Sequence, residues 1–161
     1  ELLELVGINE PEKRLKQYPH ELSGGQKRRV AIAGVMAMEP KVLILDEPAS
    51  GLDPKGREQI LGLIKEYHQE KKNTVVLVSH SMEDIAKHTT KILVMNNSKL
   101  FCYDDTAKVF HRAKELEEMG LAVPQITRVF NRLKAMGVQI DDDVYTTKYA
   151  KDLLLKMLAN Q

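Results

Sequence analysis

The sequence has a single cysteine, no long apolar run and almost no excess of charge of either sign. Cys102 by itself cannot form a disulfide bond within the chain. The most apolar stretch, residues 30–38, is much shorter than the ~20 residues that an apolar helix needs to span a bilayer. The 24 basic and 23 acidic residues leave a net charge of +1, which gives no electrostatic footprint for nucleic acid. We therefore expect any association with a membrane to involve a partner protein.

The sequence also lacks the pattern Gly-x-x-x-x-Gly-Lys-Ser/Thr, in which backbone N–H groups wrap the phosphates of a nucleotide. What it does have is the composition of a folded domain, because 161 residues, of which 43% are hydrophobic, are enough for a core. Residues 2–6 resemble the last turns of an amphipathic helix that Gly7 ends. Such an opening suggests a chain that enters in the middle of a domain, and hence a fragment.

Two continuous apolar runs of strand length, at residues 42–45 and 74–78, predict strands that are buried on both faces of a parallel sheet. A third strand is expected at residues 91–95. Asn96 and Asn97 after it can supply the positive φ angles of a tight hairpin turn.

Helices are expected between these strands. One should run from Ser23 to residue 38, and a second should start at Asp53-Pro54, where aspartate is a good cap and proline suits the first helical position. The inner face predicted for the second helix consists of Ile60, Leu61, Ile64 and Tyr67. The alternation of strands and helices predicts an α/β fold.

From residue 105 onward the pattern changes to helices, which are expected at residues 109–119, 124–136 and 148–158. An acidic, extended stretch at residues 140–145 separates the last two. No group of catalytic residue types is evident in this part of the sequence. We interpret it as an appended helical module.

The pentapeptide Leu22-Ser23-Gly24-Gly25-Gln26 stands at the predicted start of a helix. Ser23 and Gln26 have the spacing of a capping box, and the two glycines allow a ligand to approach the backbone closely. The free N–H groups and the positive end of the helix dipole favour a phosphate at this point. Ser-x-x-Gln alone more often marks an ordinary capped helix. The whole pentapeptide, followed by three basic residues and an apolar helix, favours the phosphate interpretation.

Two acids and a histidine follow the predicted strands. Asp46 and Glu47 end the first strand and His80 comes just after the second, so all three are expected at one edge of the sheet, where ligands of α/β proteins bind. One carboxylate can hold Mg²⁺, and the other can act as a general base on water. A histidine can donate to a γ-phosphate. A strand that simply ends in solvated acids is the ordinary alternative. The histidines expected to be structural or at the surface are His20, His68, His88 and His111.

Taken in order, these segments resemble the second half of an ABC transporter nucleotide-binding subunit. Residues 22–26 match its signature, residues 42–47 its Walker B strand, residues 49–53 its D-loop and His80 its switch histidine. The resemblance covers residues 1–103. It implies a P-loop NTPase-like (RecA-type) parallel sheet core that lacks its N-terminal half, with a C-terminal helical extension.

The resemblance also assigns roles. Asp46 would help to hold Mg²⁺, Glu47 would be the catalytic base, and His80 would contact the γ-phosphate of ATP. The residues that would act on ATP bound to a second subunit are Ser23, Gly24, Gly25, Gln26 and Asp53. One chain would then contribute to two sites.

A narrower resemblance, to the ATPases of energy-coupling-factor importers, rests on residues 30–35, 53–57 and 120–127. Those importers take up cobalt, nickel or vitamins, and their ATPases carry a C-terminal helical extension that contributes to dimerisation. The implied cofactors are ATP and Mg²⁺. The implied partners are a second nucleotide-binding subunit and integral membrane subunits, at the cytoplasmic face of the cell membrane.

By this resemblance the chain has three parts. Residues 1–40 would belong to the helical subdomain with the signature, residues 41–104 to the ATPase core, and residues 105–161 to the dimerisation module. Because the Walker A pattern, the aromatic base-stacking residue and the Q-loop glutamine are all missing, the chain by itself is expected to be inactive as an ATPase.

These departures leave two alternatives open. Non-transport ABC ATPases of the DNA-repair or chromosome-maintenance type also have lobes that begin without a P-loop, although residues 1–22 show none of the coiled-coil heptads that precede such a lobe. The other alternative is a non-catalytic subunit that supplies the signature to a partner's ATP site.

Overall fold

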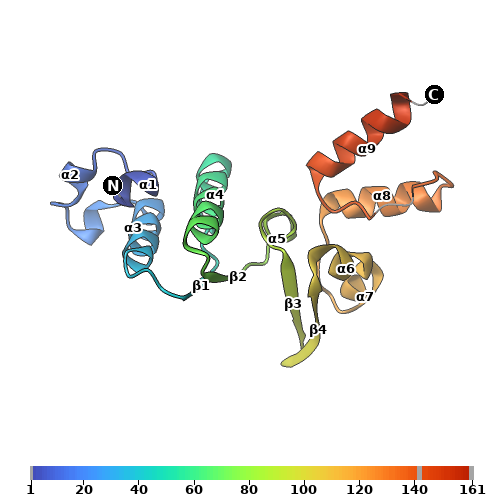
Figure 1. Ribbon diagram of the computed structural model, residues 1–161, viewed down its shortest axis with the longest axis horizontal. Helices are drawn as coiled ribbons and strands as arrows, with labels where there is room; N and C mark the ends of the chain where they lie inside the picture. Colours follow the sequence, from blue (N-terminus) through green and yellow to red (C-terminus); the bar gives the residue numbers. More distant parts are fainter. Residues whose placement is uncertain (1, 141–142, 160–161) are drawn as a thin grey trace. The chain divides into compact units, whose positions relative to one another are not determined.

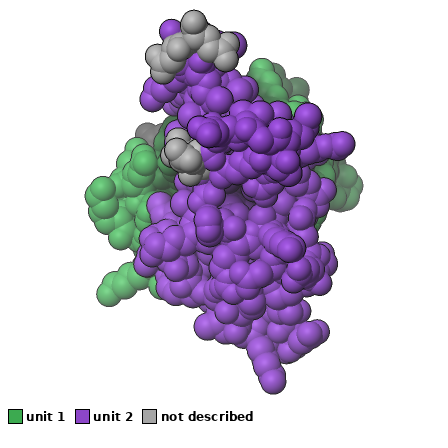
Figure 2. Space-filling view, turned by 90° about the vertical axis from the view of Figure 1, so that its right-hand side faces the viewer, with its two compact units in different colours: residues 1–80 green, residues 81–161 purple. Residues whose placement is uncertain are grey.

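A computed structural model describes residues 2–140 and 143–159 of the chain (Figure 1). The chain divides into two compact units, residues 1–80 and residues 81–161 (Figure 2). The elements of the first unit are α1 (Leu2–Leu5), α2 (Pro11–Arg14), the short 3₁₀ helix η1 (Pro19–Glu21), α3 (Gly24–Met36), β1 (Val42–Asp46), α4 (Pro54–Lys71) and β2 (Thr74–Val78). The elements of the second unit are α5 (Met82–His88), β3 (Lys91–Asn96), β4 (Lys99–Asp105), α6 (Thr106–His111), α7 (Ala113–Glu118), α8 (Gln125–Ala135) and α9 (Thr147–Ala159).

The first unit contains a parallel strand pair. β1 and β2 pair in register from Val42 opposite Thr74 to Asp46 opposite Val78, and α4 connects them. The expected caps set where α4 starts, because the Asp53 side chain accepts a hydrogen bond from the N–H of Gly56 and Pro54 takes the first helical position. The parallel sheet fragment and the α/β order are therefore confirmed.

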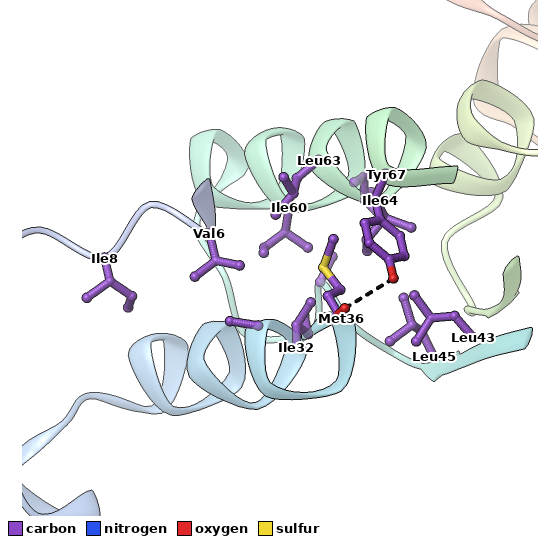
Figure 3. Packing of buried hydrophobic residues seen from close by; sticks show 13 residues of the cluster. Val6, Ile8, Ile32, Met36, Leu43, Leu45, Ile60, Leu63, Ile64 and Tyr67 are labelled. Atoms are coloured by element: carbon purple, nitrogen blue, oxygen red, sulfur yellow. Dashed lines mark hydrogen bonds between the residues drawn. The ribbon is translucent and has the colours of Figure 1, made fainter. Parts of the chain in front are cut away.

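The core of the first unit lies between α3, α4 and one face of the strand pair (Figure 3). Leu43 of β1 is fully buried there with Met36 of α3 and Ile60 of α4. Tyr67 fixes the end of this contact, because its hydroxyl donates to the carbonyl oxygen of Met36 at 3.1 Å. The predicted inner face of α4 is confirmed by the burial of Ile60, Leu61, Ile64 and Tyr67.

The prediction that both strands are buried on both faces is wrong for the described chain. Val42 and Ile44 of β1 are 55% and 67% exposed, and Val76 and Val78 of β2 are 42% and 48% exposed. Side chains alternate between the faces of a strand, and α3 and α4 cover only the face that carries Leu43. A continuous apolar run shows that both faces of a strand are suited to burial. It does not show that the described chain contains an element that packs on the second face.

The second unit contains an antiparallel hairpin. β3 and β4 pair from Lys91 opposite Asp105 to Asn96 opposite Lys99. The two turn residues with positive φ are Asn97 (49°) and Ser98 (59°), one position later than the expected Asn96 and Asn97. The difference arises because Asn96 still pairs in the ladder, which leaves the next two residues to form the turn.

The helices of the second unit depart from expectation at one point. The single helix expected at residues 109–119 is two helices, α6 and α7, because the backbone leaves the helical region at Arg112 (φ −87°, ψ 31°). Two buried clusters stabilise this unit, one around Val109 and Phe110, and the other around Phe130 and Ala150. Of the expected extended stretch, residues 141–142 lie outside the described residues. In the described ranges, no helix is both long and apolar enough to cross a membrane.

Candidate functional site

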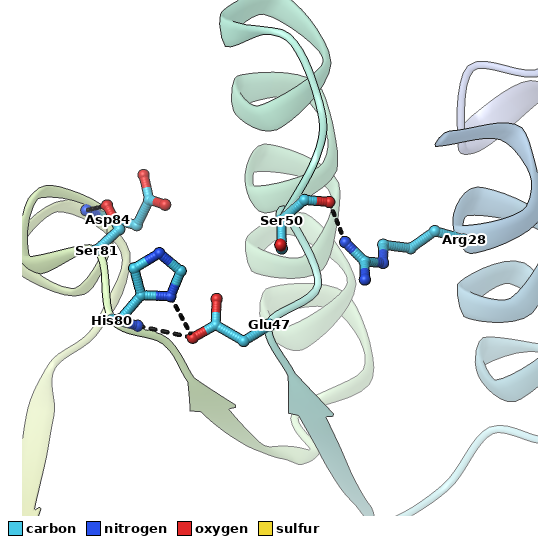
Figure 4. Close-up of polar contacts among 6 residues, drawn as sticks. All are labelled: Arg28, Glu47, Ser50, His80, Ser81 and Asp84. Carbon is cyan, nitrogen blue, oxygen red and sulfur yellow. Dashed lines mark hydrogen bonds and ion pairs between the residues drawn. The ribbon is translucent and has the colours of Figure 1, made fainter. Parts of the chain in front are cut away.

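The carboxyl edge of the parallel pair brings Glu47 and His80 together, as the strand pattern predicted. The N–H of Glu47 continues the ladder by donating to the carbonyl of Val78 at 2.9 Å. Oε1 of Glu47 then accepts two hydrogen bonds from His80, one from its backbone N–H at 2.8 Å and one from ring atom Nδ1 at 2.7 Å (Figure 4). Because a carboxylate only accepts, Nδ1 carries the proton in this contact, and Nε2 is the ring atom left for a ligand.

Glu47 has an unusual backbone. Its φ angle is 48°, in the left-handed region. For any residue that has a side chain, this conformation is unfavourable in free energy. The conformation is held by the bond from its N–H to Val78 and by the N–H of Ser50, which donates to the Glu47 carbonyl at 3.1 Å. Strained residues of this kind cluster at functional sites, where the surrounding structure fixes them.

Asp46 is the last residue of β1 and its side chain is exposed next to Glu47 in the chain. Mg²⁺ is usually bound by one or two protein carboxylates together with water and substrate phosphates, so an exposed carboxylate at this edge suits that ion. Among the described residues no group of three or more histidine, cysteine, aspartate or glutamate side chains forms a complete metal cage.

The signature residues form a capped helix start. The N–H of Gln26 donates to Ser23 Oγ at 3.2 Å, and the N–H of Ser23 donates to Gln26 Oε1 at 2.9 Å, so the expected capping box is present. Gly24 has open space where a side chain would be, whereas a Cβ on Gly25 would lie 3.0 Å from a methyl group of Leu52. The turn after β1 therefore lies directly against the first turn of α3.

A pocket of about 450 Å³ lies at this helix start, and it brings the signature and Asp53 together. Its lining includes the side chains of Ser23, Gln26, Arg29, Asp53 and Gln59. Asp46, Glu47 and His80 do not line it. The predicted site residues thus fall into two groups, one at the carboxyl edge of the strands and one in this pocket.

Sequence reasoning missed two arginines. Arg29 donates to the carbonyl of Val6 at 2.9 Å and to Gln59 at 3.3 Å, and so ties α1 and α4 to α3. Its guanidinium fills the space beside two glycines, since a Cβ on Gly7 or Gly56 would lie only 2.3 Å or 2.7 Å from it.

Arg28, the preceding residue, donates to the carbonyl of Ser50. The run of basic residues after the signature, which contains both arginines, was the only hint in the sequence. Such a run does not show whether an arginine is solvated or forms a contact with another element.

Comparison with known proteins places these features in a family. The sequence profile of the ABC transporter family matches residues 1–50. In sequence and fold the chain corresponds to about half of an ABC transporter ATP-binding protein.

Within that class it is similar to the energy-coupling factor transporter ATP-binding protein EcfA2. It is 52% identical to EcfA2 of Clostridium tetani over 159 residues, which are 99% of this chain and 55% of the relative. It is 49% identical to EcfA2 of Clostridium perfringens over 158 residues, which are 98% of this chain and 55% of that protein. The chain therefore spans about half the length of the curated relatives it matches.

Solved structures agree with this assignment. CbiO1 from Clostridium perfringens, part of the ABC transporter complex CbiONQ, matches with a TM-score of 0.58 and 37% identity, over 81% of this chain and 51% of that one. An ATP-binding cassette solved as a dimer in a post-hydrolysis state with ADP and Pi matches with a TM-score of 0.60 and 30% identity, over 65% of this chain and 44% of that one. The partial P-loop ABC ATPase fold is confirmed, and the named relatives are transporter proteins rather than DNA-repair ATPases.

Proposed function

We propose that this chain contributes the catalytic base, the switch histidine and the signature to an ATP-hydrolysing subunit of an energy-coupling-factor importer of cobalt, nickel or vitamins. The observation that carries the proposal is the contact between Glu47 and His80 at the carboxyl edge of β1 and β2. Supporting it is the similarity to EcfA2 proteins along nearly the whole chain.

Each residue has a chemical task in this proposal. Both bonds from His80 end on Glu47 Oε1, so Oε2 is the oxygen placed to take a proton from an attacking water. His80 can turn Nε2 toward the transferred phosphoryl group. Asp46 supplies a carboxylate for Mg²⁺, and that ion, when bound, neutralises charge on the phosphates.

The pocket beside the signature serves a second ATP in the same proposal. Ser23, Gly24, Gly25 and Gln26 present the N-terminus of a 13-residue helix, where the positive end of the helix dipole suits a phosphate, and Asp53 lies at the wall of the same pocket. That ATP would be held by a second nucleotide-binding subunit. Residues 105–161 would contribute to the dimer, and membrane subunits would hold the protein at the cytoplasmic face of the membrane.

Mg²⁺-dependent ATP hydrolysis by the protein, as its gene encodes it, tests the proposal. Glu47→Gln should lower the turnover of bound ATP by roughly 10²–10⁴-fold and leave the Kd for ATP unchanged, since a general base contributes that much to the rate but little to binding. His80→Ala should also lower the rate.

The chain offers a matched control for His80. His111 makes the same kind of contact in the second unit, with Nδ1 2.7 Å from Asp143, and it is about as exposed as His80. His111→Ala should leave turnover unchanged. Equal losses for the two histidine variants would contradict a special role for His80.

A second function is favoured by the separation of the two groups of site residues. Because the pocket at the signature forms without Glu47 or His80, the chain can supply it to a partner even where its own strand edge is not used. Mixing the chain with an intact subunit that is mutated in its own signature tests this idea. Recovery of ATP hydrolysis supports it, and a mixture that stays inactive contradicts it.

A further inference from the structure

The two groups of site residues are joined by a line of hydrogen bonds that starts at Arg28. This residue lies in α3, behind the signature, and its half-buried guanidinium donates to the carbonyl oxygen of Ser50 (Figure 4). The acceptor is a neutral backbone group, so the contact is a directed hydrogen bond and not an ion pair. Arg28 therefore contacts the backbone of the turn that follows β1 directly.

That turn is tightly built. The N–H of Ser50 donates to the carbonyl of Glu47 at 3.1 Å, and the N–H of Leu52 donates to the carbonyl of Ala49 at 3.3 Å. Ala49 is buried, and Gly51 has a φ angle of 72° that a residue with a side chain adopts only with strain. A shift of the Ser50 peptide group is therefore passed to its neighbours rather than absorbed.

Glu47 stands at the far end of the turn. It holds the strained φ angle of 48°, and its carboxylate accepts both hydrogen bonds from His80. The line thus runs from Arg28 through Ser50 and Glu47 to His80, entirely within the first unit. A strained residue keeps its conformation only while its surroundings hold it, so the position of the Glu47 carboxylate depends on how the turn is anchored.

We propose that Arg28 is a positioning residue, which ties helix α3 to the turn after β1 and so holds the Glu47 carboxylate in place. The inference rests on the proposed function for the role of Glu47. Leu52, which touches Gly25 from the same turn, adds a second contact between the helix and the turn.

Two measurements on the protein, as its gene encodes it, test the proposal. The rate of amide hydrogen exchange in residues 47–52 reports how stable the turn is. Steady-state hydrolysis at varied ATP concentration gives kcat and KM, which report how the stability of the turn affects catalysis. Arg28→Ala removes the donor but keeps a good helix former, whereas Arg28→Lys keeps a cation that can still donate to the carbonyl. Lys65→Ala, which removes an exposed cation from α4, is the control for loss of charge.

The expected results differ among the variants. Arg28→Ala should speed exchange in residues 47–52 and lower kcat by about tenfold or more, with KM for ATP within about twofold, because misplacing a catalytic group costs rate rather than binding. Arg28→Lys should recover a large part of both, and Lys65→Ala should change neither. A melting temperature close to that of the unchanged protein would show that Arg28→Ala still folds.

Each contrary result has a definite meaning. Unchanged exchange in Arg28→Ala overturns the contact, and faster exchange with unchanged kcat overturns its role in positioning Glu47. A protein with no ATP hydrolysis before any substitution overturns the proposed function instead, and the exchange experiment still decides whether Arg28 holds the turn.

Discussion

The described residues form two strand pairs, and the side chains proposed to act on ATP meet at the end of the parallel one. In the parallel pair β1 and β2 both strands run toward the same edge, so the residues that follow them, Glu47 and His80, meet there. In the antiparallel pair β3 and β4 the strands end at opposite edges, and a tight turn joins them at one of these. Parallel pairing brings strand ends together from distant parts of a sequence, and antiparallel pairing does not.

The two pairs are alike in another respect. Each has one face packed in a buried cluster and one face that is exposed and apolar, which carries Val42, Ile44, Val76 and Val78 in the parallel pair and Leu93, Met95, Leu100 and Tyr103 in the hairpin. The proposed difference in function therefore depends on the strand ends and not on the faces.

The largest expected effect concerns the two faces of β1. In the 161-residue chain, Leu43→Ala should lower the free energy of unfolding by ~2–5 kcal/mol, since it leaves a cavity among α3 and α4. Ile44→Ala, one residue on, should change it by less than about 0.5 kcal/mol, because that side chain is already in solvent. Urea unfolding followed by circular dichroism measures both. Equal losses would mean that the second face of the strand pair is covered in solution.

The capping residues give the next prediction, and they also compare the two units. Asp53→Ala should cost about 1 kcal/mol of unfolding free energy, because the side chain caps α4 through the N–H of Gly56. Asp105 stands at the same position before α6 but makes no capping hydrogen bond, so Asp105→Ala should cost less. Thermal unfolding of the two variants side by side decides the matter. A larger loss for Asp105→Ala would contradict the capping geometry of both helices.

These caps show what the sequence could predict and why. The capping box at Ser23, the cap at Asp53 and the meeting of Glu47 with His80 follow from signals that are local or that depend on the rule for parallel strands. The contacts of Arg28 and Arg29 could not be predicted, because they join residues more than twenty positions apart, whose approach is decided by packing.

Two further differences have local physical causes. The hairpin was predicted, but its turn is displaced by one residue, since both asparagines tolerate positive φ and the strand ladder decides which of them takes it. The break between α6 and α7 contains no glycine or proline from which it could have been predicted. At Arg112 the side chain instead packs on the ring of Phe101 and bonds to Glu115, while the backbone leaves the helix.

The displaced turn makes a smaller prediction, of the opposite sign. Ser98 has a φ angle of 59°, so Ser98→Gly should raise the free energy of unfolding by roughly 0.5 kcal/mol, because relief of a left-handed residue outweighs the greater entropy of glycine. ATP hydrolysis should not change, since the hairpin turn is not part of the proposed site. A loss of stability in thermal unfolding would show that Ser98 makes the turn in some other way. Glu47 has a similar φ angle, but there the strain accompanies a carboxylate that the proposed reaction needs.

The smallest effect is expected from an exposed ion pair in the second unit. Arg112 donates to both carboxylate oxygens of Glu115, at 2.8 Å and 2.6 Å, and these hydrogen bonds lower the pKa of Glu115 below its usual value of 4.5. A lowered pKa means that the unfolded chain binds this proton more readily, so the pair stabilises the fold above the ordinary glutamate pKa and the contribution is lost as the pH falls through the lowered value. The difference in melting temperature between the unchanged chain and Glu115→Gln should therefore be small at neutral pH and shrink further in acid, because an exposed pair is well screened. A difference that grows on acidification would contradict the sign. In the protein as its gene encodes it, the same substitution should leave ATP hydrolysis unchanged, whereas Glu47→Gln should lower it by roughly 10²–10⁴-fold, because Glu47 is the proposed base for water.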